Sequence, residues 1–136
     1  MAEPHERGVL DTSVIIDMPD LSKQALPVSS TVTTVTLAEL SAGLHTTPSP
    51  AERASRAERL QRVEAHLDPI PFDADAARRY GHLVALVIAF GRNPRPRRLD
   101  LMIAATAAAN GLPLYTRNPD DFKGLETAVT IVPIAD

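Results

Sequence analysis

The chain has 136 residues and a formal net charge of −3 at pH 7, a length typical of one domain with a sizeable core. It contains no cysteine, which excludes disulfides, thiolate metal sites and cysteine nucleophiles and fits a reducing compartment. No apolar run could span a bilayer, and the N-terminal residues lack a signal-peptide segment. We therefore expect a cytoplasmic protein with no membrane partner, built as one domain over 1–136, with 1–7 as a flexible extension.

The first third of the chain predicts two strands followed by a helix. An apolar strand is centred on residues 9–10, and the β-branched run at 28–36 predicts a second strand. Thr36 is followed three residues later by Glu39, a capping-box pattern that predicts a helix starting at Thr36. One face of this helix is apolar and consists of Leu37, Leu40 and Leu44.

The middle of the chain predicts two longer helices around a short extended segment. Ser49 is followed by proline at the first helical position, which predicts a helix over about 50–67. Residues 68–72 favour a very short strand. Asp73 is a helix-capping residue, and the helix that it starts is expected to end at Gly91.

An alanine-rich helix is predicted from about Leu99 to Asn110, ended by Gly111, with further strands at 112–116 and 129–133. Strands that alternate with helices indicate an α/β fold with a central, mainly parallel sheet of four to five strands flanked by helices. Parallel sheets place ligand sites at the carboxyl ends of their strands.

Acidic residues stand where several of these elements begin or end. Asp11 ends the first strand, Glu39 opens the first long helix, Asp100 opens the alanine-rich helix, and Asp120 and Asp121 follow the strand at 112–116. Each has a purely structural interpretation, as a helix cap, a capping-box member or a turn residue. A carboxylate at the edge of a core is costly, however, unless something pairs with it.

Taken together, these acids favour a metal site. Three of them follow strands at the same edge of the predicted sheet, and clustered carboxylates repel one another unless a cation neutralises them. Oxygen ligands without cysteine or suitably spaced histidine select a hard cation such as Mg²⁺ or Mn²⁺. Such an ion can activate water and stabilise a phosphoryl transition state.

A basic segment, RNPRPRR at 92–98, leads directly into Asp100. Its two prolines disfavour a helix and predict an extended loop. Because arginine suits bidentate phosphate contacts, we expect Arg95 and Arg97 to position a phosphate-containing substrate beside the acids. The alternative is a solvated charge run that only aids solubility.

Four segments, taken in order, resemble a PIN domain: LDTSVII at 10–16, TLAELSAGL at 36–44, IPFDADAARRYG at 70–81 and RRLDLMIAATAAANGLPLYTRNPDDF at 97–122. In particular, they are similar to the VapC-type ribonuclease toxins of type II toxin–antitoxin modules. The resemblance runs from Val9 to the C-terminus. It implies a PIN-like three-layer fold and a Mg²⁺-dependent endoribonuclease in which Mn²⁺ can substitute.

The resemblance also assigns site residues. The acids that match the family's metal-binding and catalytic positions are Asp11, Glu39 and Asp100. Ser13 matches the polar residue beside the first acid. Where many PIN domains have a further acid, this chain has Asn118, so the fourth catalytic position falls to Asp121, to Asp120, or to Asn118 acting through a water.

The family further implies partners. These are an RNA substrate, a second copy of the chain in a homodimer, and a cognate antitoxin that inhibits it in a heterotetramer or larger assembly. We expect helices around 14–24 and 36–67 to form an apolar groove for the antitoxin. Its candidate contacts are Leu21, Leu40 and Leu44.

Three other interpretations remain open. A phosphatase that forms a phospho-aspartate is an enzyme alternative, but it needs a second acid two residues after Asp11, where Ser13 stands. A receiver-like signalling domain needs an acidic pair in its first loop and a lysine after its last strand, and neither is evident. A PIN-like module kept only for binding is disfavoured because Asp11, Glu39 and Asp100 are all present.

Overall fold

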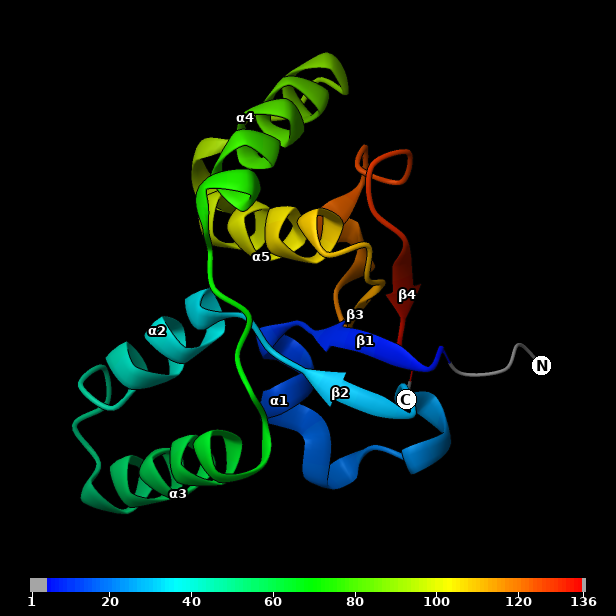
Figure 1. Cartoon of the computed structure of the whole chain (residues 1–136). Coiled ribbons are helices and arrows are strands. Elements are labelled where there is room, and N and C mark those ends of the chain that lie inside the picture. The colour runs from blue at the N-terminus through cyan, green and yellow to red at the C-terminus, as the bar shows by residue number, and fades with distance from the viewer. Residues whose placement is uncertain (1–4, 136) are drawn as a thin grey trace.

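The computed structural model describes residues 5–135 and has a central sheet of four parallel strands in the order β2-β1-β3-β4 (Figure 1). The strands are β1 (Arg7–Leu10), β2 (Ser29–Thr31), β3 (Leu114–Thr116) and β4 (Ile131–Pro133). The chain fills one side of β1 first and then crosses to its other side, so the strand order reverses between β1 and β3. The predicted parallel α/β fold is confirmed.

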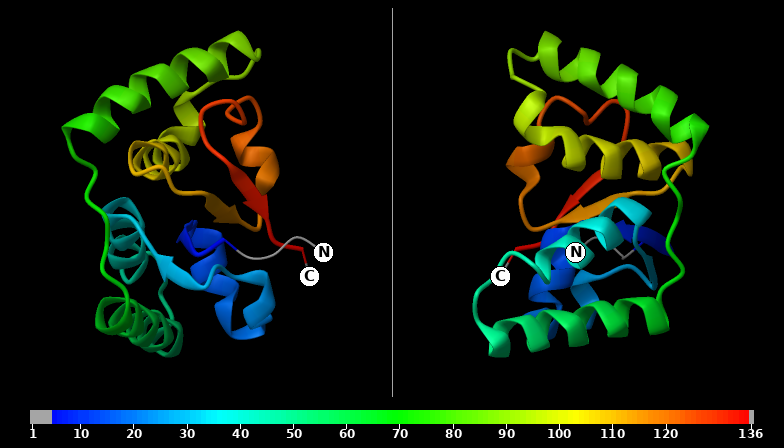
Figure 2. Two further views of the ribbon diagram at one scale, coloured as in Figure 1. Left: turned by 45° about the vertical axis from the view of Figure 1, so that its right-hand side comes forward. Right: turned by 90° about the vertical axis from the view of Figure 1, so that its left-hand side faces the viewer.

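Helices pack against both faces of the sheet (Figure 2). They are α1 (Thr12–Asp17), α2 (Thr34–Gly43), α3 (Pro50–His66), α4 (Ala74–Ala89) and α5 (Arg98–Ala109). Helices α4 and α5 cover one face and α1 and α3 the other, while α2 contacts both layers. Short 3₁₀ turns occupy Met18–Asp20, Lys23–Ala25, Arg95–Arg97 and Pro119–Phe122. Within the described residues, no helix has the length and apolar character needed to cross a bilayer.

Burial of the sheet on both faces explains why consecutive positions in the central strands hold apolar side chains. Val9 and Leu114 point into the cluster formed with α4 and α5, whereas Leu10 and Tyr115 point into the cluster formed with α1 and α3. All four side chains are at most 2% exposed. Successive strand residues face opposite sides, so a parallel sheet covered by helices needs apolar residues at every position.

Two predicted helix starts are confirmed and one is wrong. Ser49 Oγ accepts from the Glu52 N–H at 3.2 Å, and Asp73 Oδ1 accepts from the Ala76 N–H at 3.0 Å. The capping residue of α2 is Thr33, not Thr36, since Thr33 Oγ1 accepts from the Thr36 N–H at 3.2 Å. Glu39 therefore lies in the second turn of α2, where its carboxylate is not used as a cap.

The extended segments are shorter than the sequence predicts. The run at 28–36 forms a strand only at Ser29–Thr31, because α2 takes over at Thr34. The expected strand at 68–72 is reduced to a single bridge between Thr33 and Ile70. The predicted extended loop at 92–98 contains a 3₁₀ turn at Arg95–Arg97, closed by an N–H from Arg97 to the Pro94 carbonyl at 3.0 Å.

The predicted N-terminal extension is wrong at its inner end. Residues 1–4 lie outside the described part of the chain, but Arg7 already belongs to β1. The carbonyls of His5 and Glu6 accept from the Val28 and Ser29 N–H groups at 2.9 and 2.7 Å. These bonds continue the β1–β2 ladder toward the N-terminus.

Gly8 in β1 supplies a test of this packing. A Cβ at Gly8 would lie 2.7 Å from Tyr115 Cε1 and 3.1 Å from Pro27 Cβ. We predict that Gly8→Ala lowers the free energy of unfolding by about 1–3 kcal/mol through overpacking, measured by urea denaturation. Gly81→Ala is the matched control, because nothing lies within 4 Å of its Cβ and a helix interior gains roughly 0.5–1 kcal/mol from the change. Equal stabilities of the two variants would contradict the prediction.

Candidate functional site

The candidate site lies at the carboxyl ends of β1 and β3, which is the point where the strand order reverses and where open α/β sheets bind ligands. Asp11 follows β1 directly and is only 4% exposed. Its Oδ2 atom accepts from Ser13 Oγ at 2.8 Å and from Thr116 Oγ1 at 2.9 Å. Burial nevertheless raises the pKa of Asp11 above its ordinary value, although both hydroxyls act to lower it.

Glu39 is held by a chain of two threonines. Thr12 Oγ1 donates to Glu39 Oε1 at 2.8 Å, and Thr12 Oγ1 and Thr36 Oγ1 are 3.0 Å apart. A hydroxyl has one proton, and that of Thr12 points to Glu39, so Thr36 is the donor in the second bond. Burial raises the pKa of Glu39, with a smaller contribution from the Asp11 charge.

Asp100 lies in the first turn of α5, and its pKa is strongly raised. Burial, followed by the charges of Asp11, Asp121 and Glu39, raises the pKa of Asp100 to about 7, against a weaker opposing effect of Arg97. The charges of Asp11, Asp121 and Glu39 all act on Asp100, so these three acids lie within electrostatic reach of it.

Of the candidates for the fourth catalytic position, Asp121 has the strongest electrostatic interaction with the other acids. It raises the pKa of both Asp11 and Asp100 and forms a short ion pair with Arg97. Asp120 instead pairs with Lys123 at 2.9 Å and Arg92 at 3.0 Å, and hydrogen bonds to these two cations hold its pKa below the usual value. Asp120 is therefore already neutralised on the surface.

Asn118 and Arg97 make contacts that differ from the catalytic and substrate-binding roles expected from the sequence. The backbone N–H of Asn118 donates to Thr116 Oγ1 at 2.9 Å, so this residue supports the hydroxyl that holds Asp11. Arg97 pairs with Asp121 rather than lying free on a loop. Arg95 does lie beside the acids, because it lines a pocket of about 400 Å³ together with Glu39 and Asp100.

Residue-by-residue reasoning on the sequence missed the hydroxyl groups that hold the carboxylates. Thr12, Thr36 and Thr116 are the residues concerned. Thr116 is 0% exposed and stands at the end of a predicted strand, at the same sheet edge as Asp11. A buried threonine at the carboxyl end of a central strand is the signal that could have identified it, since a buried hydroxyl requires a partner.

The donor chemistry fits a hard divalent cation. In the arrangement seen here, no group of three or more His, Cys, Asp or Glu side chains among residues 5–135 is placed to hold a metal ion. Mg²⁺, however, keeps several waters and needs only one or two carboxylates together with substrate phosphate oxygens. The acids supply oxygen donors alone. Burial, and to a smaller extent the charges of the neighbouring acids, raises their pKa values, and a bound cation would offset both effects.

Comparison with known proteins places this arrangement in context. A family model described as PIN domain matches residues 8–126. Ribonuclease VapC5 of Mycobacterium tuberculosis is 39% identical over 127 residues, which cover 91% of each chain. The crystal structure of VapBC-5, a member of the VapBC family of toxin–antitoxin systems from the same organism, matches with a TM-score of 0.84 and 38% identity over 95% of this chain and 99% of that one.

A more distant structure shares the fold. The crystal structure of DNA-bound VapBC from Salmonella typhimurium matches with a TM-score of 0.72 at 22% identity, over 93% of this chain and 96% of that chain.

The raised pKa of Asp100 predicts how stability depends on pH. Between about pH 4, its ordinary pKa, and about pH 7, the folded protein holds more protons on Asp100 than the unfolded chain does, so its contribution to the free energy of unfolding falls as pH rises. Asp100→Asn removes this contribution. Urea unfolding in EDTA should therefore show a larger loss of stability from about pH 5 to about pH 8 for the wild type than for the variant. Equal losses would contradict the assignment.

Proposed function

The chain is a VapC-type member of the PIN domain family, and on that premise we propose that it is a Mg²⁺-dependent endoribonuclease, the toxin of a type II toxin–antitoxin pair. The observation that carries the proposal is the convergence of Asp11, Glu39 and Asp100 at the switch point of the sheet, with the pKa of each carboxyl raised. An acidic, partly buried site at this position suits hydrolysis of a phosphodiester more than recognition of an anion.

In the proposed mechanism, Asp11, Glu39 and Asp100 would hold the cation, which we propose to be Mg²⁺ with Mn²⁺ able to substitute. A bound divalent ion supplies positive charge at the scissile phosphate and lowers the pKa of a bound water. Ser13 and Thr116 fix Asp11 by donating to a single carboxylate oxygen. Thr12 fixes one oxygen of Glu39, which leaves the other to orient water.

Asp121 is proposed as the fourth acid of the site. Its ion pair with Arg97 joins the start of α5 to the turn after β3 and holds the Asp121 carboxylate in place. Arg97 is therefore proposed to position the Asp121 carboxylate. Arg95 keeps the proposed part of a substrate contact, since it lines the pocket beside Glu39 and Asp100.

An antitoxin is the proposed protein partner. The similar crystal structure of VapBC-5 is that of a member of a family of toxin–antitoxin systems. In this chain, an apolar pocket of about 370 Å³ lies between α1, the turn after it and α3. Its apolar lining includes Ile15, Met18, Leu26, Val63 and Leu67. Residues of both segments that we expect to contact the antitoxin line this pocket, which supports the proposal.

The side chains that line this pocket differ from those predicted. Leu40 is 8% exposed and belongs to the core, and neither Leu21 nor Leu44 lines the pocket. A homodimer, a heterotetramer or larger assembly with the antitoxin, and a cytoplasmic location remain proposals that rest on the family resemblance and the composition.

The metal assignment is tested with Asp100→Asn, which removes charge but little volume. We predict that it lowers RNA cleavage in Mg²⁺ by about 100-fold or more, because a site built to hold charge loses one of its carboxylates. EDTA should stop the wild type, and Mn²⁺ or Mg²⁺ should restore it. Asp120→Asn is the control, as it removes the same charge from an exposed acid already paired with Lys123 and Arg92.

The same assay separates the nuclease from a phosphatase. The wild type should cut RNA and leave small phosphomonoesters untouched. Wild-type cleavage by purified Asp100→Asn, or hydrolysis of phosphomonoesters in place of RNA, would sink the proposal.

The antitoxin pocket is tested by placing a charge within it. We predict that Met18→Glu weakens inhibition by the co-expressed antitoxin by at least about tenfold, equivalent to roughly 1.4 kcal/mol, with inhibition measured relative to the same variant's cleavage without antitoxin. Val28→Glu places the same charge on a side chain that is 75% exposed and does not line the pocket, so inhibition should persist. Equal inhibition of both variants would show that the antitoxin binds outside this pocket.

A further inference from the structure

Two pockets adjoin Glu39 on different sides. One, which we call the α3 pocket, has a volume of about 330 Å³ and lies between α1, α2 and α3. The other, the α5 pocket, has a volume of about 400 Å³ and lies at the start of α5. Glu39 lines both, so the two pockets flank a single carboxylate of the candidate site.

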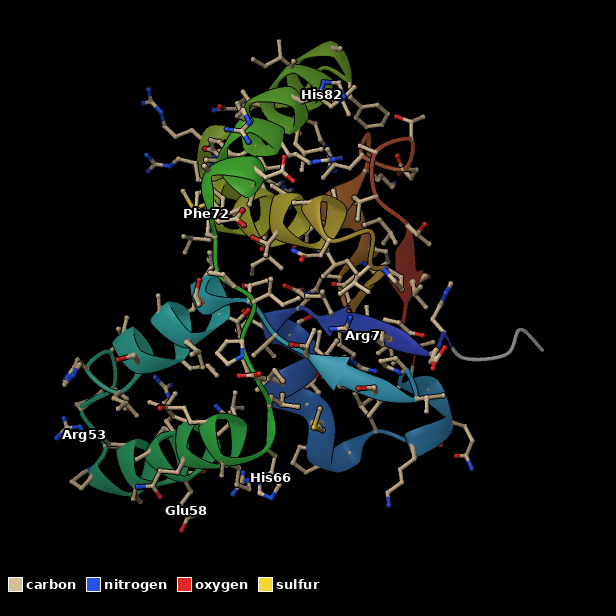
Figure 3. The ribbon with its side chains drawn as sticks, viewed as in Figure 1. Arg7, Arg53, Glu58, His66, Phe72 and His82 are labelled. Atoms are coloured by element: carbon tan, nitrogen blue, oxygen red, sulfur yellow. The ribbon has the colours of Figure 1, made fainter. Side chains whose placement is uncertain are left out.

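The α3 pocket contains a cation without a counterion. Arg59 lines it, is only partly exposed, and forms no hydrogen bond or ion pair within the described residues. Its neighbour Arg56 is by contrast fully engaged, donating to Glu52 Oε1 at 3.1 Å and to the Gly43 carbonyl at 2.7 Å. The adjacent acid Glu58 points away from the body of the protein (Figure 3).

The α5 pocket contains two further arginines that form no ion pair with an acid among residues 5–135. Arg95 and Arg98 line it, and the only bond between them is from Arg98 Nε to the Arg95 carbonyl at 3.2 Å. The other two arginines of the basic segment are paired instead, Arg92 with Asp120 and Arg97 with Asp121. The segment therefore divides into paired arginines and arginines that remain available to an anion beside Glu39.

We propose that a single RNA strand crosses the acidic site from one pocket to the other. The phosphate on one side of the cut contacts Arg59, and phosphates on the other side contact Arg95 and Arg98. This rests on the proposed ribonuclease function and extends it by naming the path of the substrate. The two pockets, of about 330 and 400 Å³, are on the scale of one nucleotide each, and positively charged surfaces beside such pockets suit a single flexible strand.

This path has a direct consequence for the type of cleavage. Binding is divided between the two sides of the cut, so a substrate needs nucleotides on both sides of the scissile phosphate. Arginine supplies these contacts without reading the bases, because its fork of donors matches phosphate oxygens.

The test is the salt dependence of RNA binding, measured on the full chain by fluorescence anisotropy. The probe is a fluorescein-labelled, single-stranded RNA of about 12 nucleotides with mixed sequence, held in EDTA so that it is not consumed. Each phosphate contact to a single strand contributes about 0.7 to the slope of log K against log salt. Arg59→Gln should therefore reduce the slope by about 0.7, and Arg59→Gln with Arg98→Gln by about 1.4.

Two further variants serve as controls. Arg78→Gln removes the same charge from the exposed face of α4, in the opposite layer, and should leave the slope unchanged. Arg59→Lys keeps the charge and should retain the wild-type slope, which separates a phosphate contact from a packing effect.

Three results would overturn the proposal. They are equal slopes for Arg59→Gln and Arg78→Gln, a double variant no different from Arg59→Gln alone, and binding of a duplex of equal length as tightly as the single strand. Failure of the proposed function looks different. In that case wild-type protein does not cut RNA in Mg²⁺, while the dependence of binding on Arg59 can still be measured in EDTA.

Discussion

Burial of the Asp11 carboxylate at the carboxyl end of β1 is the constraint to which the surrounding structure is fitted. Each charge-assisted hydrogen bond to such a group stabilises it by roughly 1.5–3 kcal/mol. Asp11 receives two of them, from Ser13 at the start of α1 and from Thr116 at the end of β3. Because Thr116 is 0% exposed and belongs to the neighbouring strand, the register between β1 and β3 determines whether the carboxylate is held.

The hydrogen bonds do not fully offset burial, since the pKa of Asp11 remains raised. The Asp11 charge adds to the effect of burial on its neighbours, because it raises the pKa of Glu39 and Asp100 further. The protein therefore holds the carboxylates in an arrangement that is unfavourable without positive charge, which is the condition under which a cation binds strongly. Threonine and serine hydroxyls fix the acids without neutralising them.

Local signals in the sequence predicted local features correctly. The capping positions of α3 and α4 follow from side chains within three residues, Ser49 to Glu52 and Asp73 to Ala76. The start of α2 was mispredicted because Thr33 and Thr36 are both plausible caps, and a bridge to the distant Ile70 fixes the backbone at Thr33.

Pairs between distant segments could not be predicted in the same way. Arg97 and Asp121 are separated by 24 positions, and neither has a neighbour that identifies its partner. The proximity of Asp11 to the segment after β3 that carries Asp121, on the other hand, follows from the rule that parallel strands end at one edge of the sheet. Glu39 and Asp100 lie instead in α2 and α5, and the strand-end rule does not place them.

The brevity of the two outer strands has a consequence for association in crowded solution. An open sheet exposes unpaired backbone groups at its edges, and long edges invite strand addition and aggregation. Here β2 and β4 have only three residues each. The residue at the end of β4 is Pro133, which has no N–H to offer to an incoming strand. The sheet can thus present the edge beside Asp11 to a ligand while its lateral edges provide little template for cross-β growth.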